Sequence, residues 1–242
     1  MRTVLKPVVA LFLIFLTVSC RKDVLEGSVV FSLVEGEVVS CTKGSVSEYV
    51  PVPLPEDFEL LIKNSATGTV IFTGKLTEWS EETKIRPGDY SAEVSCGTAE
   101  NEGPDSPFFF GSEAFQVRRG EKTEVSITVS LGNCIVSISC TESFRQYYPE
   151  QSFHIETPVS PEGFDYDGRA VFVAYQFSIS GEVKDRYGAV KKLEKSSWKG
   201  APATSYSVVY DVSNVGSATI IVIFDNFLYP VDTGGIDLKD ED

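Results

Sequence analysis

Short segments in which apolar and polar residues alternate run through this chain, and they constrain its fold more than any other feature. A period of two residues marks a strand with one buried face, because neighbouring side chains of a strand point to opposite sides. Four segments show this period, namely residues 58–62, 90–96, 125–131 and 171–179. Residues 219–224 form an unbroken apolar run, which is typical of a strand buried on both faces. The chain is therefore predicted to be all-β.

Turns rich in glycine, proline and asparagine separate these segments, at residues 66–68, 86–89, 119–121 and 131–133. Short strands with a turn every 8 to 12 residues or so, roughly the spacing seen here, are typical of β-sandwiches. Residues 141–161 interrupt the pattern, because Pro149, Pro158 and Pro161 oppose strand pairing. We therefore predict two β-sandwich domains of the immunoglobulin or transthyretin-like kind, at residues 24–143 and 150–238, followed by an acidic tail at 239–242.

Helical spacing is suggested at one place in the sequence. Tyr187, Val190 and Leu193 recur at intervals of three residues, beside two lysines. That spacing puts apolar side chains on one side of a helix. We expect a short helical turn there.

Residues 1–19 have the composition of a secretory signal peptide. Arg2 and Lys6 form a basic start, and residues 8–18 are an apolar run. A transmembrane helix needs about 20 apolar residues, so the run is too short to span a bilayer and has the length of a signal-peptide core. The run ends at Ser19 and Cys20.

The junction at Cys20 resembles a bacterial lipoprotein box, in which a small residue precedes the cysteine that receives the lipid. Ser19 and Cys20 match that box, whereas Thr17 stands where leucine is usual. We predict cleavage before Cys20 and a lipidated N-terminus at residues 20–23, with the membrane as a partner. Asp23 favours export to the outer face of the outer membrane, and a periplasm-facing lipoprotein remains open. An ordinary secretory signal with a coincidental cysteine is the alternative.

The charge balance excludes several classes of function. The chain has 35 acidic and 21 basic residues and a formal net charge of −14, whereas nucleic-acid binding requires a basic surface. His154 is the only histidine, so a mechanism that needs two imidazoles is excluded. The sequence contains neither a glycine-rich phosphate loop nor a Gly-x-Ser-x-Gly motif. We expect no catalytic residues, no cofactor and no nucleic-acid partner.

Four cysteines besides Cys20 have a state that the sequence leaves open: Cys41, Cys96, Cys134 and Cys140. Cys134 and Cys140 lie on one predicted strand, about 20 Å apart along it, so they should not pair with each other. Buried free thiols are the favoured interpretation. A disulfide is the alternative, because export leads to an oxidising compartment. Zinc is not expected without a Cys-x-x-Cys motif, and a cysteine nucleophile would have His154 as its only imidazole partner.

The many carboxylates give weak signals for a site. Asp165 and Asp167 are close in sequence, and Asp225, Asp232 and Asp237 gather near the C-terminus. A calcium loop or a glycosidase pair could use such residues. The Asp-x-Asp-x-Asp-Gly pattern of a calcium loop does not occur. We interpret the carboxylates as solvated surface charge and expect no metal site.

Residues 107–111, Pro-Phe-Phe-Phe-Gly, carry the main candidate for a binding surface. Three consecutive phenylalanines in an extended chain cannot all face one core. We expect Phe108 and Phe110 to fill the core while Phe109 packs between the domains. The alternative is that exposed rings contact a sugar or a protein. Weaker candidates of the same aromatic kind are Tyr147, Tyr148, Trp79 and Trp198.

Six pieces of residues 24–143 follow the order and spacing of a known family. They are Thr42-Lys43, Asp57-Phe58, Thr67-Gly68, Pro87-Gly88-Asp89-Tyr90, residues 107–111, and Gly120-Glu121-Lys122-Thr123 leading into Val125. Together with the lipoprotein signal, they resemble a family of lipoproteins from Bacteroides and its relatives that is known only as a domain of unknown function. That family is distantly similar to transthyretin-like fimbrial subunits and their anchors. The resemblance implies a β-sandwich in the cell envelope, with a role in adhesion, pilus assembly or surface binding and no catalytic residues.

Three functions follow for comparison. The first is a non-enzymatic, surface-displayed lipoprotein with an adhesion or fimbria-associated role, whose partners are other envelope proteins, fimbrial subunits or glycans. The second is a glycan-binding accessory lipoprotein of a polysaccharide-capture system, which would use the aromatic segment. The third is a hydrolase built from scattered carboxylates, for which the sequence offers no specific constellation.

Overall fold

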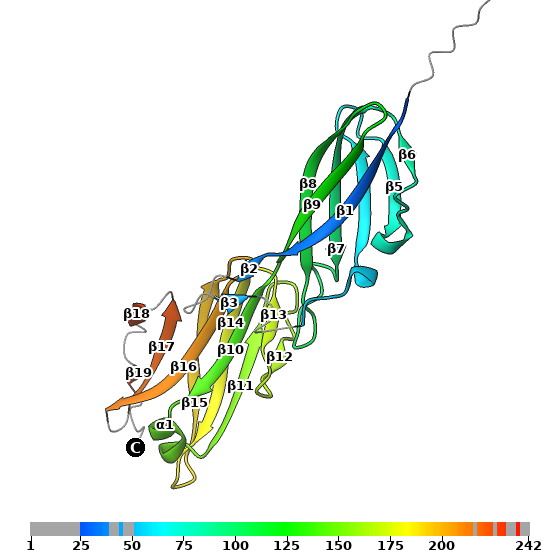
Figure 1. Ribbon diagram of the computed structural model, residues 1–242. Coiled ribbons are helices and arrows are strands. Elements are labelled where there is room, and N and C mark those ends of the chain that lie inside the picture. Colours follow the sequence, from blue (N-terminus) through cyan, green and yellow to red (C-terminus); the bar gives the residue numbers. More distant parts are fainter. Residues whose placement is uncertain are drawn as a thin grey trace, which may run out of the picture.

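Figure 1 shows the computed structural model, which describes the backbone of residues 25–38, 44–45, 51–214, 217–224, 227–230 and 236–237 and side chains within 25–36 and 51–212. The chain forms two lobes placed end to end, the N-terminal lobe (residues 25–131) and the C-terminal lobe (residues 134–237), each around its own core. Strands dominate, and the all-β prediction is confirmed. The signal peptide, Cys20, Cys41, Thr42-Lys43 and the tail at 239–242 lie outside the described residues.

The N-terminal lobe is a sheet in the order β5-β4-β7-β8-β9-β1-β6 that folds over on itself. β8 and β9 pair only at Phe109–Leu131 and Phe110–Ser130, so the strands on either side of that junction form two layers with the core between them. β1 pairs with β9 in parallel, and the other pairs of this sheet are antiparallel. The strands are β1 (Gly27–Glu35), β4 (Glu59–Asn64), β5 (Val70–Lys75), β6 (Lys84–Ile85), β7 (Gly88–Cys96), β8 (Phe109–Val117) and β9 (Lys122–Leu131). A small pair, β2 (Glu37–Val38) with β3 (Gly44–Ser45), and two 3-10 turns, η2 (Pro55–Asp57) and η3 (Leu76–Glu78), complete its described elements.

Alternation along β7 and β9 builds much of the N-terminal core. In β7, Tyr90, Ala92 and Val94 are buried, and the residues between them face outward. In β7, the two-residue period of apolar residues in the sequence is therefore also the period of buried residues in the structure. The indole of Trp79 closes one side of this core, because its Nε1 donates a hydrogen bond to the carbonyl of Val29 at 2.9 Å.

The C-terminal lobe packs two sheets around a second core, in the orders β13-β10-β16-β17-β18, with β19 on β17, and β12-β11-β14-β15. β10 and β16 run in parallel. The elements are β10 (Cys134–Cys140), α1 (Glu142–Tyr147), β11 (Glu150–Glu156), β12 (Phe164–Asp165), β13 (Val171–Val173), β14 (Gln176–Lys184), β15 (Val190–Lys199), β16 (Ser205–Asn214), β17 (Ser217–Phe224), β18 (Phe227–Pro230) and β19 (Ile236–Asp237). Thr141 starts the short helix α1, since its Oγ1 accepts a hydrogen bond from the Phe144 amide at 3.2 Å.

The sheets divide earlier in the chain than the sequence suggested. β10, expected in the first sandwich, is hydrogen-bonded to β13 and β16 of the C-terminal lobe, so the change of sheet falls at residues 132–133 and not between 143 and 150. One face of β10 packs in the C-terminal core through Cys134, Val136, Ile138 and Cys140, whereas on its other face Ile135 belongs to the N-terminal core and Ser139 is exposed. The alternation of apolar and polar residues cannot show which lobe such a strand belongs to, because it contributes side chains to both cores. Whether the lobes are independent domains remains a prediction.

Two local expectations were wrong. The helical turn expected at Tyr187, Val190 and Leu193 is the β14–β15 hairpin, in which Leu193 is buried while Tyr187 and Val190 are exposed. The long strand expected at 171–179 is two strands, β13 and β14, separated by a bend at residues 174–175. In the first case the turn of an antiparallel hairpin gave a spacing that imitates a helix, and in the second an apolar alternation continued across a bend between strands of different sheets.

Three cysteines are free thiols: Cys96, Cys134 and Cys140. The favoured interpretation of buried free thiols is confirmed for Cys134 and Cys140, whereas Cys96 is free but only half-buried and Cys41 lies outside the described residues. Burial raises the pKa of the Cys134 thiol to about 12 and that of Cys140 to about 11, which keeps both thiols protonated and unreactive near neutral pH. In the described part of the chain, no helix is long and apolar enough to cross a membrane.

Candidate functional site

The three consecutive phenylalanines lie on opposite sides of β8. Phe109 is 1% exposed and lies in the N-terminal core, whereas Phe110 is 41% exposed on the outer face. Phe108 lies beside Phe110, with 6.4 Å between the ring centroids. The expectation that Phe108 and Phe110 fill the core while Phe109 packs between the domains was therefore wrong, because β8 pairs with β7 in a register that turns Phe109 into the N-terminal core. The alternative, exposed rings on the surface, holds for Phe110.

Phe110 stands beside an open groove on the outer face of β4, β5, β7 and β8. Strand pairing sets Glu59 opposite Ser95 and Ser95 opposite Phe110, so these three side chains form one row across the sheet. The adjacent row carries Thr73, Leu61 and Glu93. The groove has a volume of about 440 Å³, and residues 97–100 and Phe108 complete its wall.

Two ion pairs border the groove. The Lys75 ammonium lies 2.9 Å from a carboxylate oxygen of Glu59, and the Lys63 ammonium lies 3.2 Å from one of Glu93. The hydrogen bond to Glu59 raises the pKa of Lys75, so this cation stays charged at neutral pH. An aromatic ring flanked by carboxylates and ammonium groups can stack on the face of a sugar ring while the charged groups bond its hydroxyls.

The remaining aromatic candidates do not join this groove. Trp198 stacks on Phe177 of the C-terminal core, with centroids 5.4 Å apart and an angle of 28° between the rings. Trp79 packs edge-on against Phe31 in the N-terminal core, and Tyr148 is 1% exposed. Tyr147 remains partly exposed at the end of α1.

Sequence reasoning missed the junction between the lobes, which the loop at residues 97–108 forms. Gly103 and Phe172 exchange two backbone hydrogen bonds, of 3.0 and 2.9 Å, as a bridge between the β7–β8 loop and β13. The Phe172 side chain is 4% exposed and packs in the N-terminal core, although its strand belongs to the other lobe. Asn133, fully buried between β9 and β10, holds the same loop through Phe108 N at 3.3 Å and the Ser106 carbonyl at 2.9 Å.

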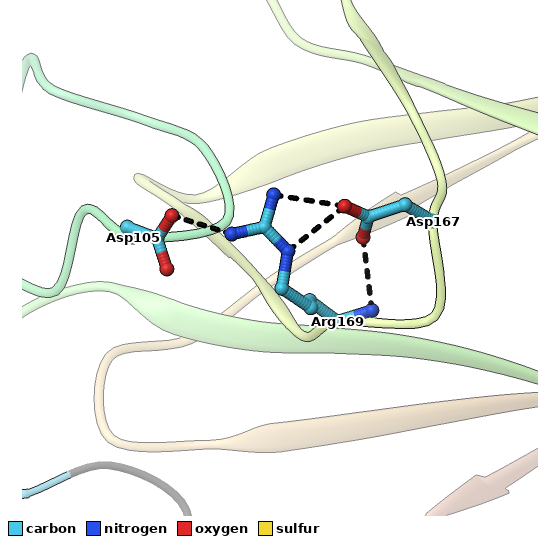
Figure 2. Close-up of polar contacts among 3 residues, drawn as sticks. All are labelled: Asp105, Asp167 and Arg169. Carbon is cyan, nitrogen blue, oxygen red and sulfur yellow. Dashed lines mark hydrogen bonds and ion pairs between the residues drawn. The ribbon is translucent and has the colours of Figure 1, made fainter.

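Charged side chains add a second set of contacts at this junction. Glu102 accepts hydrogen bonds from the Thr157 hydroxyl and, at 2.7 Å, from the Ala174 amide. Figure 2 shows Arg169 between two carboxylates, with Nη1 2.6 Å from Asp105 and Nε and Nη2 each 2.8 Å from Asp167. The hydrogen bond from Arg169 lowers the pKa of Asp167. These contacts fix how the lobes meet, and the only sequence signal for them was the acidic, turn-rich composition of residues 99–106.

The groups weighed for catalysis or metal binding have structural partners. His154 Nδ1 lies 2.8 Å from Asp165, and Nε2 lies 3.0 Å from the carbonyl of Glu162. Asp167 is held by Arg169. Among the described side chains, no group of three or more His, Cys, Asp or Glu residues could hold a metal ion.

Fold and surface together define an all-β protein of two end-to-end lobes that offers a surface groove. The chain belongs to the family described as Domain of unknown function (DUF4493), whose model matches residues 26–236. The match covers both lobes, whereas the resemblance read from the sequence was carried by residues 24–143.

No curated protein matches the chain. Among solved structures it is similar to a protein of Bacteroides fragilis provisionally named for cell adhesion, with 10% identity, 86% of this chain and 100% of that chain covered, and a TM-score of 0.39. A Bacteroides thetaiotaomicron protein provisionally named for polysaccharide binding gives 8% identity, 86% and 99% coverage, and a TM-score of 0.40. A Bacteroides uniformis protein provisionally named for cell adhesion gives 11% identity, covers 74% of this chain and 95% of that chain, and has a TM-score of 0.42. At TM-scores below 0.5, these likenesses carry no argument about the ligand or partners of this chain.

Proposed function

We propose that the protein is a non-enzymatic lipoprotein of the outer membrane, acylated at Cys20 and displayed at the cell surface. Its role is adhesion or fimbria-associated binding and assembly, with envelope proteins, fimbrial subunits or glycans as partners. The proposal joins the signal sequence to the geometry of the described lobes.

One observation supports the display role above the others. The described chain starts at the end of the N-terminal lobe that lies farthest from the C-terminal lobe (Figure 1). Cys20 precedes Leu25 by only five residues, a stretch that spans at most about 17 Å. A lipid at Cys20 would therefore hold one end of the molecule near the membrane and leave the C-terminal lobe at the other end. The contacts of Phe172, Glu102 and Arg169 across the junction oppose bending between the lobes.

Protease shaving of intact cells tests the proposal, with a blot against the C-terminal lobe and a periplasmic protein as control. Surface display predicts that the signal is lost while the control protein stays intact. A signal that is cut only after lysis would put the protein in the periplasm and contradict the display role.

The anchor has a test of its own. Wild-type cells fed an alkyne-tagged fatty acid should label the protein, and the Cys20→Ser variant should stay unlabelled and keep its signal peptide. Cys96→Ser is the matched control, because Cys96 is a free thiol within the folded lobe. Equal labelling of wild type and Cys20→Ser would contradict acylation at this residue.

Assembly can be separated from adhesion on gels. A subunit that completes its sheet with a strand of another chain should run as a heat-sensitive ladder when the sample is not boiled. A strict monomer under those conditions leaves adhesion as the role and removes fimbrial assembly.

The groove supports a second candidate function, capture of neutral glycans for a polysaccharide-uptake system. The exposed Phe110 ring beside Glu59 and Glu93 is the specific observation in its favour. Phe110→Ala should weaken binding of a glycan found on an array about tenfold, by removing the stacking surface. Tyr175→Ala is the matched control, because Tyr175 is another exposed aromatic, 56% exposed in the C-terminal lobe. Equal losses of glycan affinity in the two variants would exclude Phe110 and its groove as the binding site.

A further inference from the structure

The end of the C-terminal lobe opposite the start of β1 carries a cluster of two tyrosines and an arginine. It consists of the β14–β15 turn and the end of α1, and we call Tyr147, Arg186 and Tyr187 the tip cluster (Figure 1). The Arg186 guanidinium carbon lies 4.9 Å from the centroid of the Tyr187 ring and 5.7 Å from that of Tyr147. Tyr187 is 77% exposed, which is the highest value among the exposed large hydrophobic side chains of the described part of the chain.

The guanidinium of Arg186 has no carboxylate partner among the described side chains, unlike Arg169 at the junction. The described contacts of its side chain are with two tyrosine rings, and Arg186 is exposed, so its N–H groups are accessible to solvent. A guanidinium presents its donors in a planar fork that matches a carboxylate or a sulfate. The cluster therefore has an unused anion-binding group between two ring surfaces.

The tip cluster is held in place by its neighbours. The Asp185 carboxylate accepts hydrogen bonds from the amides of Tyr187 at 2.8 Å and Ala189 at 2.9 Å, which fixes the turn. Burial opposes the ionised form of Asp185, but these amides and Lys191 outweigh it and lower its pKa. The Arg186 amide also donates to the Tyr147 carbonyl at 3.1 Å, so the turn is tied to the end of α1. A ligand would meet groups that are already in position.

The rest of the tip favours an anion. Residues 184–192 read Lys-Asp-Arg-Tyr-Gly-Ala-Val-Lys-Lys, which gives four cations and one carboxylate in a chain whose net charge is −14, and one of the cations, Lys184, is paired with Glu150 at 2.9 Å. The carboxylate is the one that the turn amides already occupy. An anionic ligand is thus repelled by most of the protein and attracted at this end, which would direct its approach.

We propose that the tip cluster binds an acidic saccharide, with a carboxylate or sulfate on Arg186 and the sugar ring against Tyr187. Tyrosine rings stack on the apolar face of a pyranose and supply a hydroxyl for its polar edge. A stable protein interface needs about 800 Å² from each partner with an apolar centre, whereas the tip offers two phenols among cations. The biological meaning of this site rests on the proposed display at the cell surface, but binding itself does not depend on it.

Calorimetric titration of the detergent-solubilised full-length protein at low salt tests the proposal. The probes are a tetrasaccharide of galacturonic acid, a sulfated galactan tetrasaccharide and a neutral galactose tetrasaccharide. One of the two acidic probes should bind at least about tenfold more tightly than the neutral one, as expected for a charge-assisted contact. The acidic probe that binds identifies the anion.

Four variants separate a built site from general charge attraction. Arg186→Gln should lose about tenfold in affinity for the acidic probe, and Arg186→Lys should lose less. Tyr187→Ala should also weaken binding, while Tyr187→Phe keeps the stacking ring and loses only the hydroxyl, so it should weaken binding less than Tyr187→Ala. Because Tyr187 is largely exposed, its substitution should leave the melting temperature unchanged.

Arg119→Gln is the matched control, because Arg119 is an exposed arginine in the β8–β9 turn of the other lobe. Its affinity should equal that of wild type, and so should that of Phe110→Ala in the separate groove. Equal losses in Arg119→Gln and Arg186→Gln, equal binding of neutral and acidic probes, or no binding of either acidic probe would each overturn the proposal. None of these results bears on surface display, which protease shaving measures independently.

Discussion

Phe172 should be the residue that holds the two lobes together, and its replacement by alanine tests how the junction is stabilised. The ring belongs to β13 of the C-terminal lobe but is 4% exposed within the N-terminal core. Replacing a buried phenylalanine by alanine costs about 3–5 kcal/mol, because the apolar contacts are lost and a cavity remains. In a protein of this size, that change lowers the melting temperature by about 6–20 °C if the lobes unfold together. The two hydrogen bonds between Gly103 and Phe172 involve only backbone atoms, so they should persist in the variant.

The charged contacts at the same junction should matter much less to stability. The Arg169 side chain is 55% exposed and Asp105 is 81% exposed, so solvent screens their attraction. Arg169→Gln should therefore cost at most about 1 kcal/mol. Comparing Phe172→Ala with Arg169→Gln shows whether burial of the Phe172 ring or the ion pairs of Arg169 contribute more to the stability of the junction.

Scanning calorimetry and urea unfolding of the full-length protein measure these differences. Phe110→Ala is the matched control, because it deletes the same side chain at a position that is 41% exposed. The reasoning fails if Phe172→Ala changes the free energy of unfolding by less than about 1 kcal/mol, or if Arg169→Gln costs as much as Phe172→Ala.

Two further predictions concern pH and backbone strain. Burial raises the pKa of Cys134 from 9.0 to about 12 and that of Cys140 from 9.0 to about 11. The unfolded chain therefore loses these protons first, and the free energy of unfolding should fall as pH rises above about 9. Urea midpoints between pH 8 and 10.5 should fall less steeply in a variant with alanine at both positions, and parallel curves for the two proteins would contradict this. Gly163 and Gly120 both have a left-handed φ, of 66° and 70°, but a Cβ at Gly163 would meet His154 and one at Gly120 would meet nothing within 4 Å. Gly120→Ala should lower the free energy of unfolding by about 1 kcal/mol and Gly163→Ala should lower it distinctly more. Thermal melts of the two variants compare these losses.

The strands were largely predictable, because their alternation is a local property of the sequence. The buried positions of β7 and β9 coincide with the apolar positions in residues 90–96 and 125–131. The side of β8 that faces inward was not predictable, since three identical neighbours give no periodic signal and only pairing with β7 turns Phe109 inward. The tip cluster was hidden for a similar reason. Tyr147 and Arg186 are far apart in sequence, and the topology of the C-terminal lobe brings them together.

The junction shows the same limit of sequence reasoning. Glu102 and Arg169 are ordinary surface residues by type, and each has a partner in the other lobe. Ile135 faces the N-terminal core from a strand whose other face belongs to the C-terminal core. Contacts of this kind depend on how distant segments meet, which alternation does not encode.

The parallel pairing of β1 with β9 gives an anchored chain a particular response to force. Eight residue pairs join the two strands, from Ser28–Lys122 to Glu35–Val129. With the lipid anchor proposed at Cys20, tension from the membrane would pull β1 from its first residue. Tension from a ligand held by the C-terminal lobe would pull β9 from its last residue, through the connection to β10. Parallel strands pulled from these opposite ends slide along each other, so the hydrogen bonds between them are loaded together in shear instead of opening one after another.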